Sequence, residues 1–169
     1  MSKNVSRREF VRSTAAVGAA APLVVSASAL GKADAPAANE RIQVGLIGCG
    51  GMGRGNLGNC ARHADVAVTG ACDVWKARRD AVVSKFPDTC KPYADYREMI
   101  DSKEIDAVII ATPPHWHTLP TIAACEAGKD IYLQKPMTLH LGESLAIKNA
   151  VKKHKIISQI GTQIHAGEN

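Results

Sequence analysis

Short apolar runs rich in β-branched residues alternate along the chain with longer segments whose apolar residues recur at helical spacing. The runs lie at 42–47, 66–73, 105–112, 130–133 and 156–161, with a short extended piece at 91–93. The helical segments run from the first strand to about residue 63, and over 74–86, 95–100, 115–128 and 139–155. We expect Asp95 to cap the third of these helices and Gly128 to end the fourth. The alternation predicts an α/β fold, a doubly wound parallel sheet of the Rossmann type with helices on both faces.

The composition is that of an ordinary globular domain. The chain has 169 residues, of which 46% are hydrophobic and 22% charged, which is enough for one domain with a real core. The formal net charge is +5, but residues 1–35 account for +3 of it. The basic balance therefore belongs largely to the N-terminus, and we expect no nucleic-acid partner.

The first 35 residues have the features of an export signal followed by a linker. The pair Arg7-Arg8 precedes an Ala-rich, moderately apolar stretch over 14–30, and small residues at 27–29 and 33–35 offer cleavage sites. This arrangement resembles a twin-arginine translocation signal, which predicts a periplasmic or otherwise exported protein. A membrane anchor and a disordered arm are the alternatives, although the stretch is short for a span. We expect no stable membrane span in the chain.

The cysteines and histidines give no sign of a metal site. The five cysteines are scattered, and no pair has C-x-x-C spacing. Most of them lie within apolar or glycine-rich stretches, which predicts buried free thiols. His115 and His117 would need a third ligand to hold a metal, and we identify none. We therefore predict that the protein has no metal site.

The loop after the first apolar run fits the dinucleotide-binding pattern G-x-G-x-x-G at a strand-to-helix turn. Gly48 would allow the tight turn, Gly50 would let the backbone approach a pyrophosphate, and Gly53 would let helix and strand pack closely. The N–H groups at the start of the following helix would face the phosphates. The residues predicted to bind the cofactor here are Gly48, Cys49, Gly50, Gly51, Met52 and Gly53.

Asp73 ends the second apolar run, about 20 positions after Gly53. An acidic side chain at that place can accept hydrogen bonds from the adenosine ribose, and it repels a 2′-phosphate. Lys76, Arg78 and Arg79 come shortly after it, and they either offset that repulsion or are solvated helix residues. NAD is the predicted cofactor, and NADP stays open.

Three further motifs join the glycine loop to give the chain a family resemblance. They are "ATPPHWH" (111–117), "LQKPM" (133–137) and "IGTQIHAGEN" (160–169). From about Arg41 to its end, the sequence resembles the N-terminal half of the Gfo/Idh/MocA oxidoreductases. The resemblance implies a Lys–Pro bond that is commonly cis, and a glutamate where this sequence has Gln134. It also implies a cofactor contact for each of Thr112, Pro113, His117, Gln134, Lys135 and Gln163.

Lys135 is the candidate catalytic residue. It comes directly after a parallel strand, where ligands sit in doubly wound sheets, and it could stabilise charge on a substrate oxygen. A surface lysine in a turn is the alternative. The resemblance implies an NAD(P)-dependent oxidoreductase that acts on the CH–OH group of a sugar, polyol or glycoside, or an NAD-dependent glycosidase. A non-catalytic nucleotide-binding module is a further alternative.

The resemblance also implies a longer protein. It assigns 41–162 to the dinucleotide-binding domain and 163–169 to the start of a crossover toward a second, substrate-binding α/β domain. We therefore expect the chain to be an N-terminal fragment that is inactive alone. A homo-oligomer is expected only together with that second domain.

Overall fold

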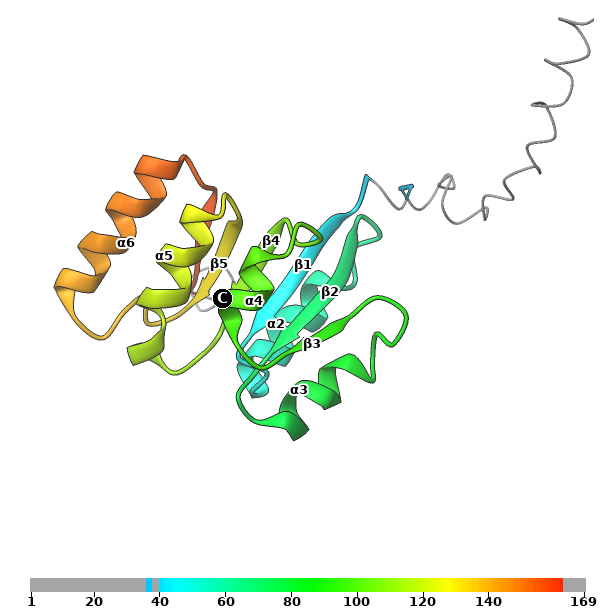
Figure 1. Cartoon of the computed structure of the whole chain (residues 1–169). Coiled ribbons are helices and arrows are strands. Elements are labelled where there is room, and N and C mark those ends of the chain that lie inside the picture. The colour runs from blue at the N-terminus through cyan, green and yellow to red at the C-terminus, as the bar shows by residue number, and fades with distance from the viewer. Residues whose placement is uncertain (1–35, 38–39, 163–169) are drawn as a thin grey trace, which may run out of the picture.

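The computed structural model describes residues 36–37 and 40–162. The predicted export signal and linker over 1–35 lie outside the described residues, as do Gln163 and the predicted crossover over 163–169. Six strands form one parallel sheet in the order β3-β2-β1-β4-β5-β6 (Figure 1). The chain order runs outward in both directions from the pair β1 and β4, as in doubly wound dinucleotide-binding folds. The predicted fold class is confirmed.

The predicted strands and helices are present, with ends that differ by a few residues. The strands are β1 (Ile42–Ile47), β2 (Val66–Cys72), β3 (Lys91–Tyr93), β4 (Ala107–Ile110), β5 (Asp130–Gln134) and β6 (Ser158–Gly161). The helices are α2 (Gly51–Cys60), α3 (Lys76–Val83), α4 (Tyr96–Asp101), α5 (Thr118–Glu126) and α6 (Leu141–His154). None of the described helices combines the length and the apolar character that a membrane span needs.

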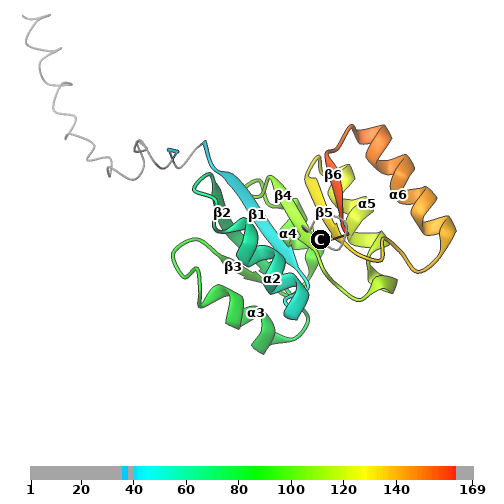
Figure 2. The same cartoon turned by 180° about the vertical axis from the view of Figure 1, so that it is seen from behind.

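Helices cover both faces of the sheet and bury a separate core on each. Figures 1 and 2 show α2 and α3 on one face and α4, α5 and α6 on the other. Successive residues of β4 point into different cores: Val108 and Ile110 pack with α4, α5 and α6, whereas Ile109 packs with α2 and α3. A strand buried on both faces has no polar side, which explains the continuous apolar run at this place in the sequence.

The helix predicted over 115–128 is divided in the structure. A short 3-10 turn, η2, occupies Pro114–Trp116, and α5 begins only at Thr118. Pro120 explains the division, because its ring would clash with the carbonyl of Trp116 in a continuous α-helix. Gly128 lies just after the end of α5 with φ +72°, as expected of a residue that ends a helix. The predicted cap of α4 is also present, since the Asp95 side chain accepts a hydrogen bond from the Arg97 N–H.

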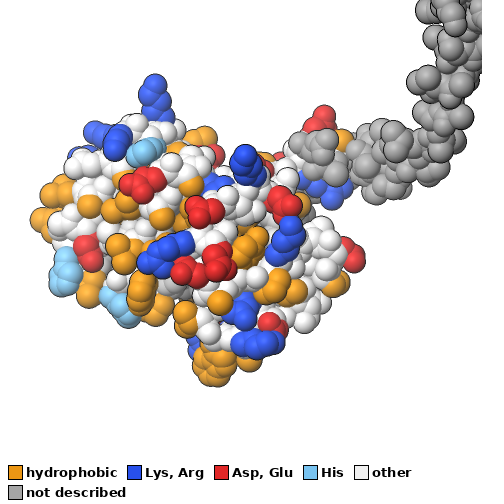
Figure 3. Space-filling model, in the orientation of Figure 1, with side chains coloured by type: hydrophobic (Ala, Val, Ile, Leu, Met, Phe, Trp, Pro, Cys, Tyr) orange, Lys and Arg blue, Asp and Glu red, His pale blue; other side chains and the backbone are white. Residues whose placement is uncertain are grey.

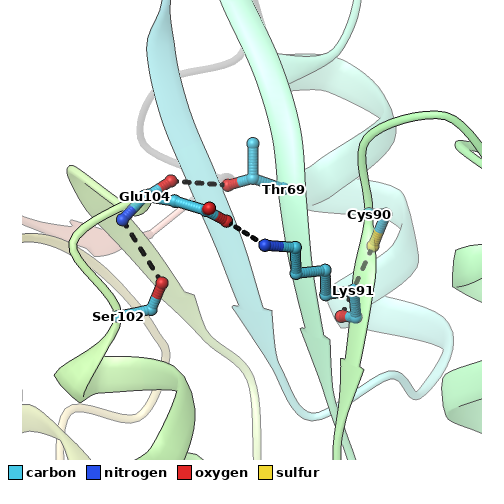
Figure 4. Close-up of polar contacts among 5 residues, drawn as sticks. All are labelled: Thr69, Cys90, Lys91, Ser102 and Glu104. Carbon is cyan, nitrogen blue, oxygen red and sulfur yellow. Dashed lines mark hydrogen bonds and ion pairs between the residues drawn. The ribbon is translucent and has the colours of Figure 1, made fainter.

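Polar contacts tie the segment before β4 to the neighbouring strands. Glu104 forms an ion pair with Lys91 at the start of β3, and its carbonyl accepts a hydrogen bond from the Thr69 hydroxyl at 3.1 Å (Figure 4). Lys129, just before β5, donates to the carbonyl oxygens of Ser102 (2.8 Å) and Ile105 (2.7 Å). The lysine and these carbonyls precede β4 and β5, so they hold the amino ends of these strands.

Charges of both signs are interspersed over the face that carries α4, α5 and α6 (Figure 3). Arg97, Asp101 and Glu126, for example, line one hollow of about 370 Å³ between α4 and α5. A surface that binds a phosphate backbone carries a continuous basic stripe, whereas the described residues of this face mix the two signs.

Candidate functional site at the carboxyl edge of the sheet

Neighbouring strands end level with one another at one edge of the sheet. Ile47 of β1 pairs with Cys72 of β2 and with Ile110 of β4, which in turn pairs with Leu133 of β5. The loops that leave these strands are therefore side by side. The connections run in opposite directions from β1 and β4, and ligands of doubly wound sheets bind at such a switch point.

Close backbone packing requires glycine at two positions of this segment, Gly48 in the loop after β1 and Gly53 in the first turn of α2. Gly48 has φ +93°, and a Cβ there would lie 2.7 Å from backbone atoms of Ala111 and Thr112. A Cβ on Gly53 would lie 2.1 Å from the carbonyl oxygen of Gly48. The predicted tight turn and the predicted close packing of helix against strand are both confirmed.

Gly50 and Gly51 face open space instead. No atom of the described residues lies within 4 Å of a Cβ placed on either of them. Gly50 is the N-cap of α2, so the backbone N–H groups of the first helical turn have no acceptor within the helix. A cradle of this kind, open where side chains are missing and lined by N–H groups, fits a pyrophosphate.

Asp73 is tied to the glycine loop. Its Oδ2 accepts a hydrogen bond from the Cys49 N–H at 2.8 Å, and its Oδ1 accepts one from the Trp75 N–H at 2.8 Å. Each carboxylate oxygen retains a further lone pair, which a ribose hydroxyl could use. The Cys49 side chain is fully buried, and burial, together with the smaller effect of the Asp73 charge, raises the pKa of its thiol to about 12. Cys49 therefore offers a ligand its backbone and not its thiol.

The three cations after β2 all have local partners. Lys76 forms an ion pair with Asp80, and the Arg78 guanidinium lies 4.6 Å from the centre of the Trp75 ring. Arg79 donates a hydrogen bond from one Nη to the Asp73 carbonyl oxygen (2.9 Å), whereas its buried Nε has no hydrogen-bond partner among the described residues. The contacts of Lys76 and Arg78 favour the interpretation of these two side chains as helix-surface residues over a site for a 2′-phosphate, whereas Arg79 is half-buried beside Asp73.

The loop after β4 carries buried polar groups. The hydroxyls of Thr112 and Thr118 are buried and have no hydrogen-bond partner among the residues that the structure describes. An orphaned buried hydroxyl beside the switch point fits a polar ligand group there. His117 is 1% exposed, and its two ring nitrogens lie 2.8 Å and 2.9 Å from the carbonyl oxygens of Thr112 and Pro136. Contact of His117 with a cofactor stays a prediction.

The strand β5 ends in a buried amide, and the next residue is an exposed lysine. Gln134 is 5% exposed, and its Oε1 accepts a hydrogen bond from the Lys135 backbone N–H at 2.6 Å. The Lys135–Pro136 bond is cis, as the family resemblance implies. Lys135 is exposed at the same edge of the sheet as the glycine loop, and Pro113, on the neighbouring loop, is also exposed.

The structure thus gathers most of the predicted site at one edge. It places there the glycine loop over 48–53, Asp73, Thr112, Pro113, Gln134 and Lys135. Within residues 36–37 and 40–162, no three His, Cys, Asp or Glu side chains gather closely enough to hold a metal ion. Sequence reasoning missed the buried hydroxyl of Thr118 and the bridging position of His117, because no motif signals a contact between two loops.

The thiols agree with the sequence in part. Cys49, Cys72, Cys90 and Cys125 are buried and free, as predicted. Cys60 is also free but only partly buried, because it is the last residue of α2, where the helix leaves the sheet.

Comparison with known proteins identifies this architecture. The profile of the Gfo/Idh/MocA family, described as an oxidoreductase family with an NAD-binding Rossmann fold, matches residues 42–162. The scyllo-inositol 2-dehydrogenase (NAD(+)) of Bacillus subtilis is 37% identical over 121 residues, which cover 68% of this chain and 35% of that protein. The alpha-N-acetylgalactosaminidase of Shewanella oneidensis is 27% identical over 172 aligned positions, covering 89% of this chain and 38% of the enzyme.

A solved structure shows the same fold. The scyllo-inositol dehydrogenase of Lactobacillus casei, determined with bound NAD(H) and scyllo-inositol, superposes with a TM-score of 0.71 at 23% identity. The match covers 76% of this chain and 38% of that one. This chain therefore spans little more than a third of the length of the relatives it matches.

Proposed function

Because the chain belongs to the Gfo/Idh/MocA family of oxidoreductases with an NAD-binding Rossmann fold, we propose that it forms the cofactor-binding part of an enzyme that oxidises or reduces a CH–OH group of a sugar or polyol. The observation that carries this proposal is the open cradle at Gly50 and Gly51, joined to Asp73 through the Cys49 N–H. The cradle supplies donors for a pyrophosphate, and the carboxylate supplies acceptors for the adjoining ribose.

The loops after β4 and β5 would hold the other half of the dinucleotide. Thr112 would supply its buried hydroxyl at the edge where β4 and β5 end, and Gln134 would contact the cofactor from the last position of β5. NAD bound there supplies the hydride acceptor at the nicotinamide ring. Asp73 favours NAD over NADP because its carboxylate repels a 2′-phosphate, and Lys76 and Arg78 after it already have partners of their own.

Lys135 would act on the substrate. Its ammonium group is exposed at the site edge and carries three N–H donors. A donor placed against the reacting hydroxyl oxygen stabilises the negative charge that develops there. Gln134 is uncharged, so the residue before Lys135 brings no negative charge that would offset the positive charge of the lysine.

The substrate class is supported by the relatives' names. The Bacillus subtilis relative is an inositol dehydrogenase, and inositol is a polyol with a ring of CH–OH groups. The alignment with alpha-N-acetylgalactosaminidase covers more of this chain, so an NAD-dependent glycosidase is the second candidate. A glycosidase would release a sugar with no net reduction of NAD, which separates the two candidates in one assay.

The cofactor part of the proposal is tested on the chain itself. We expect the purified 169-residue protein to bind NADH in calorimetric titration, and to bind NADPH more weakly. The substrate part is tested on a protein expressed with any coding sequence that continues past Asn169. Inositols, hexoses and α-N-acetylgalactosaminides are then assayed for NADH formation and for glycoside cleavage. Absence of NADH binding would contradict the proposal, because the glycine loop would then not bind this dinucleotide.

Turnover should depend on Lys135. In the longer protein we expect Lys135→Met to preserve NADH binding and to lower the rate about 10² to 10⁴-fold, as for loss of one positioned electrostatic group. Lys148→Met, on the exposed side of α6, is the matched control and should leave the rate unchanged. An unchanged rate in Lys135→Met would show that this residue does not take part in the reaction.

A further inference from the structure

His117 lies where two loops of the site meet. Strands β4 and β5 are parallel neighbours, so the loops that leave their carboxyl ends run side by side. The imidazole ring is almost fully buried between these loops. Its Nε2 lies 2.8 Å from the Thr112 carbonyl oxygen, and its Nδ1 lies 2.9 Å from that of Pro136 and 3.3 Å from that of Met137. One ring therefore spans the gap between the two loops.

The ring is braced from the start of α5. The His117 N–H donates a hydrogen bond to the Pro114 carbonyl oxygen at 3.1 Å. The His117 carbonyl accepts hydrogen bonds from the Thr121 backbone N–H (3.2 Å) and from the Thr121 hydroxyl (2.6 Å). Thr121 is itself 1% exposed. The imidazole is thus anchored to a helix that packs on β4 and β5, and not only to the loops that it contacts.

Two prolines limit the backbone hydrogen bonds that the two loops can make with each other. Pro113 and Pro136 carry no N–H group, so neither can extend the hydrogen-bond ladder between the strands. The Lys135 N–H is directed to the side chain of Gln134, its own neighbour in the chain. A side chain that contacts a carbonyl oxygen of each loop from a fixed helix is therefore placed to set the distance between them.

We propose that His117 is a positioning residue that sets the spacing between the Thr112 loop and the Lys135–Pro136 turn, and thereby the place of Lys135 beside the cofactor. The contacts of the ring are observed in the structure, whereas the identity of the cofactor beside Lys135 rests on the proposed function. A neutral imidazole donates one of the two hydrogen bonds, and a protonated one donates both. His117 would act through Lys135 and Thr112, without touching the substrate.

Three substitutions separate the two sides of the ring. His117→Phe keeps a flat ring of similar size and removes every hydrogen bond that the imidazole can donate. His117→Asn retains an N–H donor on the Nδ1 side, toward Pro136, whereas His117→Gln retains one on the Nε2 side, toward Thr112. In hydrogen exchange of the ligand-free protein, we expect the Phe variant to exchange about tenfold faster around 112 and around 135–137. The Asn variant should restore protection only at 135–137, and the Gln variant only at 112.

NADH affinity gives the second measurement. We expect His117→Phe to weaken NADH binding about tenfold, and the Asn and Gln variants to recover part of the loss. Lys129→Met is the matched control, because Lys129 is also buried and also bonds two backbone carbonyls, but at the amino ends of β4 and β5. It should lower the unfolding midpoint without weakening NADH binding in the folded protein.

The outcomes distinguish this inference from the proposed function. If the parent protein does not bind NADH, the proposed function fails, while the exchange pattern still tests the bridge. If the parent binds NADH but His117→Phe leaves both exchange segments and the affinity unchanged, His117 is not a positioning residue. The same conclusion holds if Lys129→Met weakens NADH binding as much as His117→Phe does.

Discussion

The backbone N–H of Cys49 donates a hydrogen bond to Oδ2 of Asp73 at 2.8 Å, across 24 positions of the sequence. This bond joins the loop after β1 to the end of β2, two places that the sequence marks separately as a glycine pattern and an acidic residue. The carboxylate that would hold a ribose is thereby fixed relative to the cradle that would hold the pyrophosphate. The two parts of the predicted nucleotide site are thus joined by a direct hydrogen bond.

Gly50 in the cradle and Gly53 behind it should respond differently to substitution. Gly50→Val places its side chain in open space, so we expect the fold to persist and NADH binding to be lost. Gly53→Ala places a Cβ 2.1 Å from a backbone oxygen, so we expect the free energy of unfolding to fall by at least about 2 kcal/mol. Urea denaturation and calorimetric NADH titration of both variants check the two expectations.

Gly55→Ala is the control for this pair. Gly55 lies further along α2, and a Cβ there meets no described atom within 4 Å. An alanine within a helix should add about 0.5 to 1 kcal/mol of stability and leave NADH affinity unchanged. Unaltered NADH affinity in Gly50→Val would contradict the assignment of the cradle.

Asp73 should decide the choice between the two nicotinamide dinucleotides. Asp73→Asn keeps the shape of the side chain and removes the charge that repels a 2′-phosphate. We expect it to weaken NADH binding, because a charged acceptor is lost, and to narrow the preference over NADPH by about tenfold. Competition titrations with NADH and NADPH measure both effects. A parent protein that binds NADPH better than NADH would overturn the cofactor preference.

Much of the fold could be predicted because two local features of the sequence decide it, the apolar runs of the strands and the spacing of the glycines. Burial of β4 on two faces requires a run such as Val108 to Ile110 with no polar position, and that run is visible in the sequence. The tight turn at Gly48 and the close packing at Gly53 likewise leave glycines at fixed spacing. The start of α5 was missed because the preference of one residue, Pro120, overrides a longer helical pattern.

The site was predicted less completely than the fold. The positions of Asp73 and Lys135 are set by strand ends, so sequence alone places them at one edge of the sheet. The role of the His117 ring depends on two carbonyl oxygens, at Thr112 and Pro136, that come from different loops. Backbone carbonyls are present at every residue, so no residue type marks such a contact. The partners of a buried imidazole are therefore invisible without the fold.

The N-terminal segment gives a prediction about location. We propose that Arg7-Arg8 directs export through the twin-arginine route, and the segment lies outside the described residues. Replacement of the pair by Lys-Lys should leave the protein in the cytoplasm, as measured by fractionation and immunoblotting. Replacement of Lys3 by Arg is the control and should not change the distribution. Normal periplasmic accumulation of the Lys-Lys variant would indicate another route.

The buried thiols should make the protein less stable in alkali. Burial raises the pKa of Cys49 and of Cys72 from 9.0 to about 12, and that of Cys90 to about 11. Above pH 9 these thiols ionise in the unfolded chain but stay protonated in the folded one, so the folded state binds more protons there. Their contribution to the free energy of unfolding is complete below pH 9. Above pH 9 each thiol lowers the free energy of unfolding, with a slope that approaches about 1.4 kcal/mol per pH unit.

Urea denaturation at pH 8, 9, 10 and 10.5 measures this decline. Lysines and tyrosines also titrate in the range, so Cys72→Ala is compared with the parent at each pH. The variant lacks one buried thiol, and its stability should therefore fall less steeply, by about 1.1 kcal/mol per pH unit on average between pH 9 and 10.5. The absolute stability of the variant is lower at pH 8 because a buried side chain has been shortened, so only the slopes are compared. Parallel slopes for the two proteins would show that Cys72 ionises equally in the folded and unfolded states.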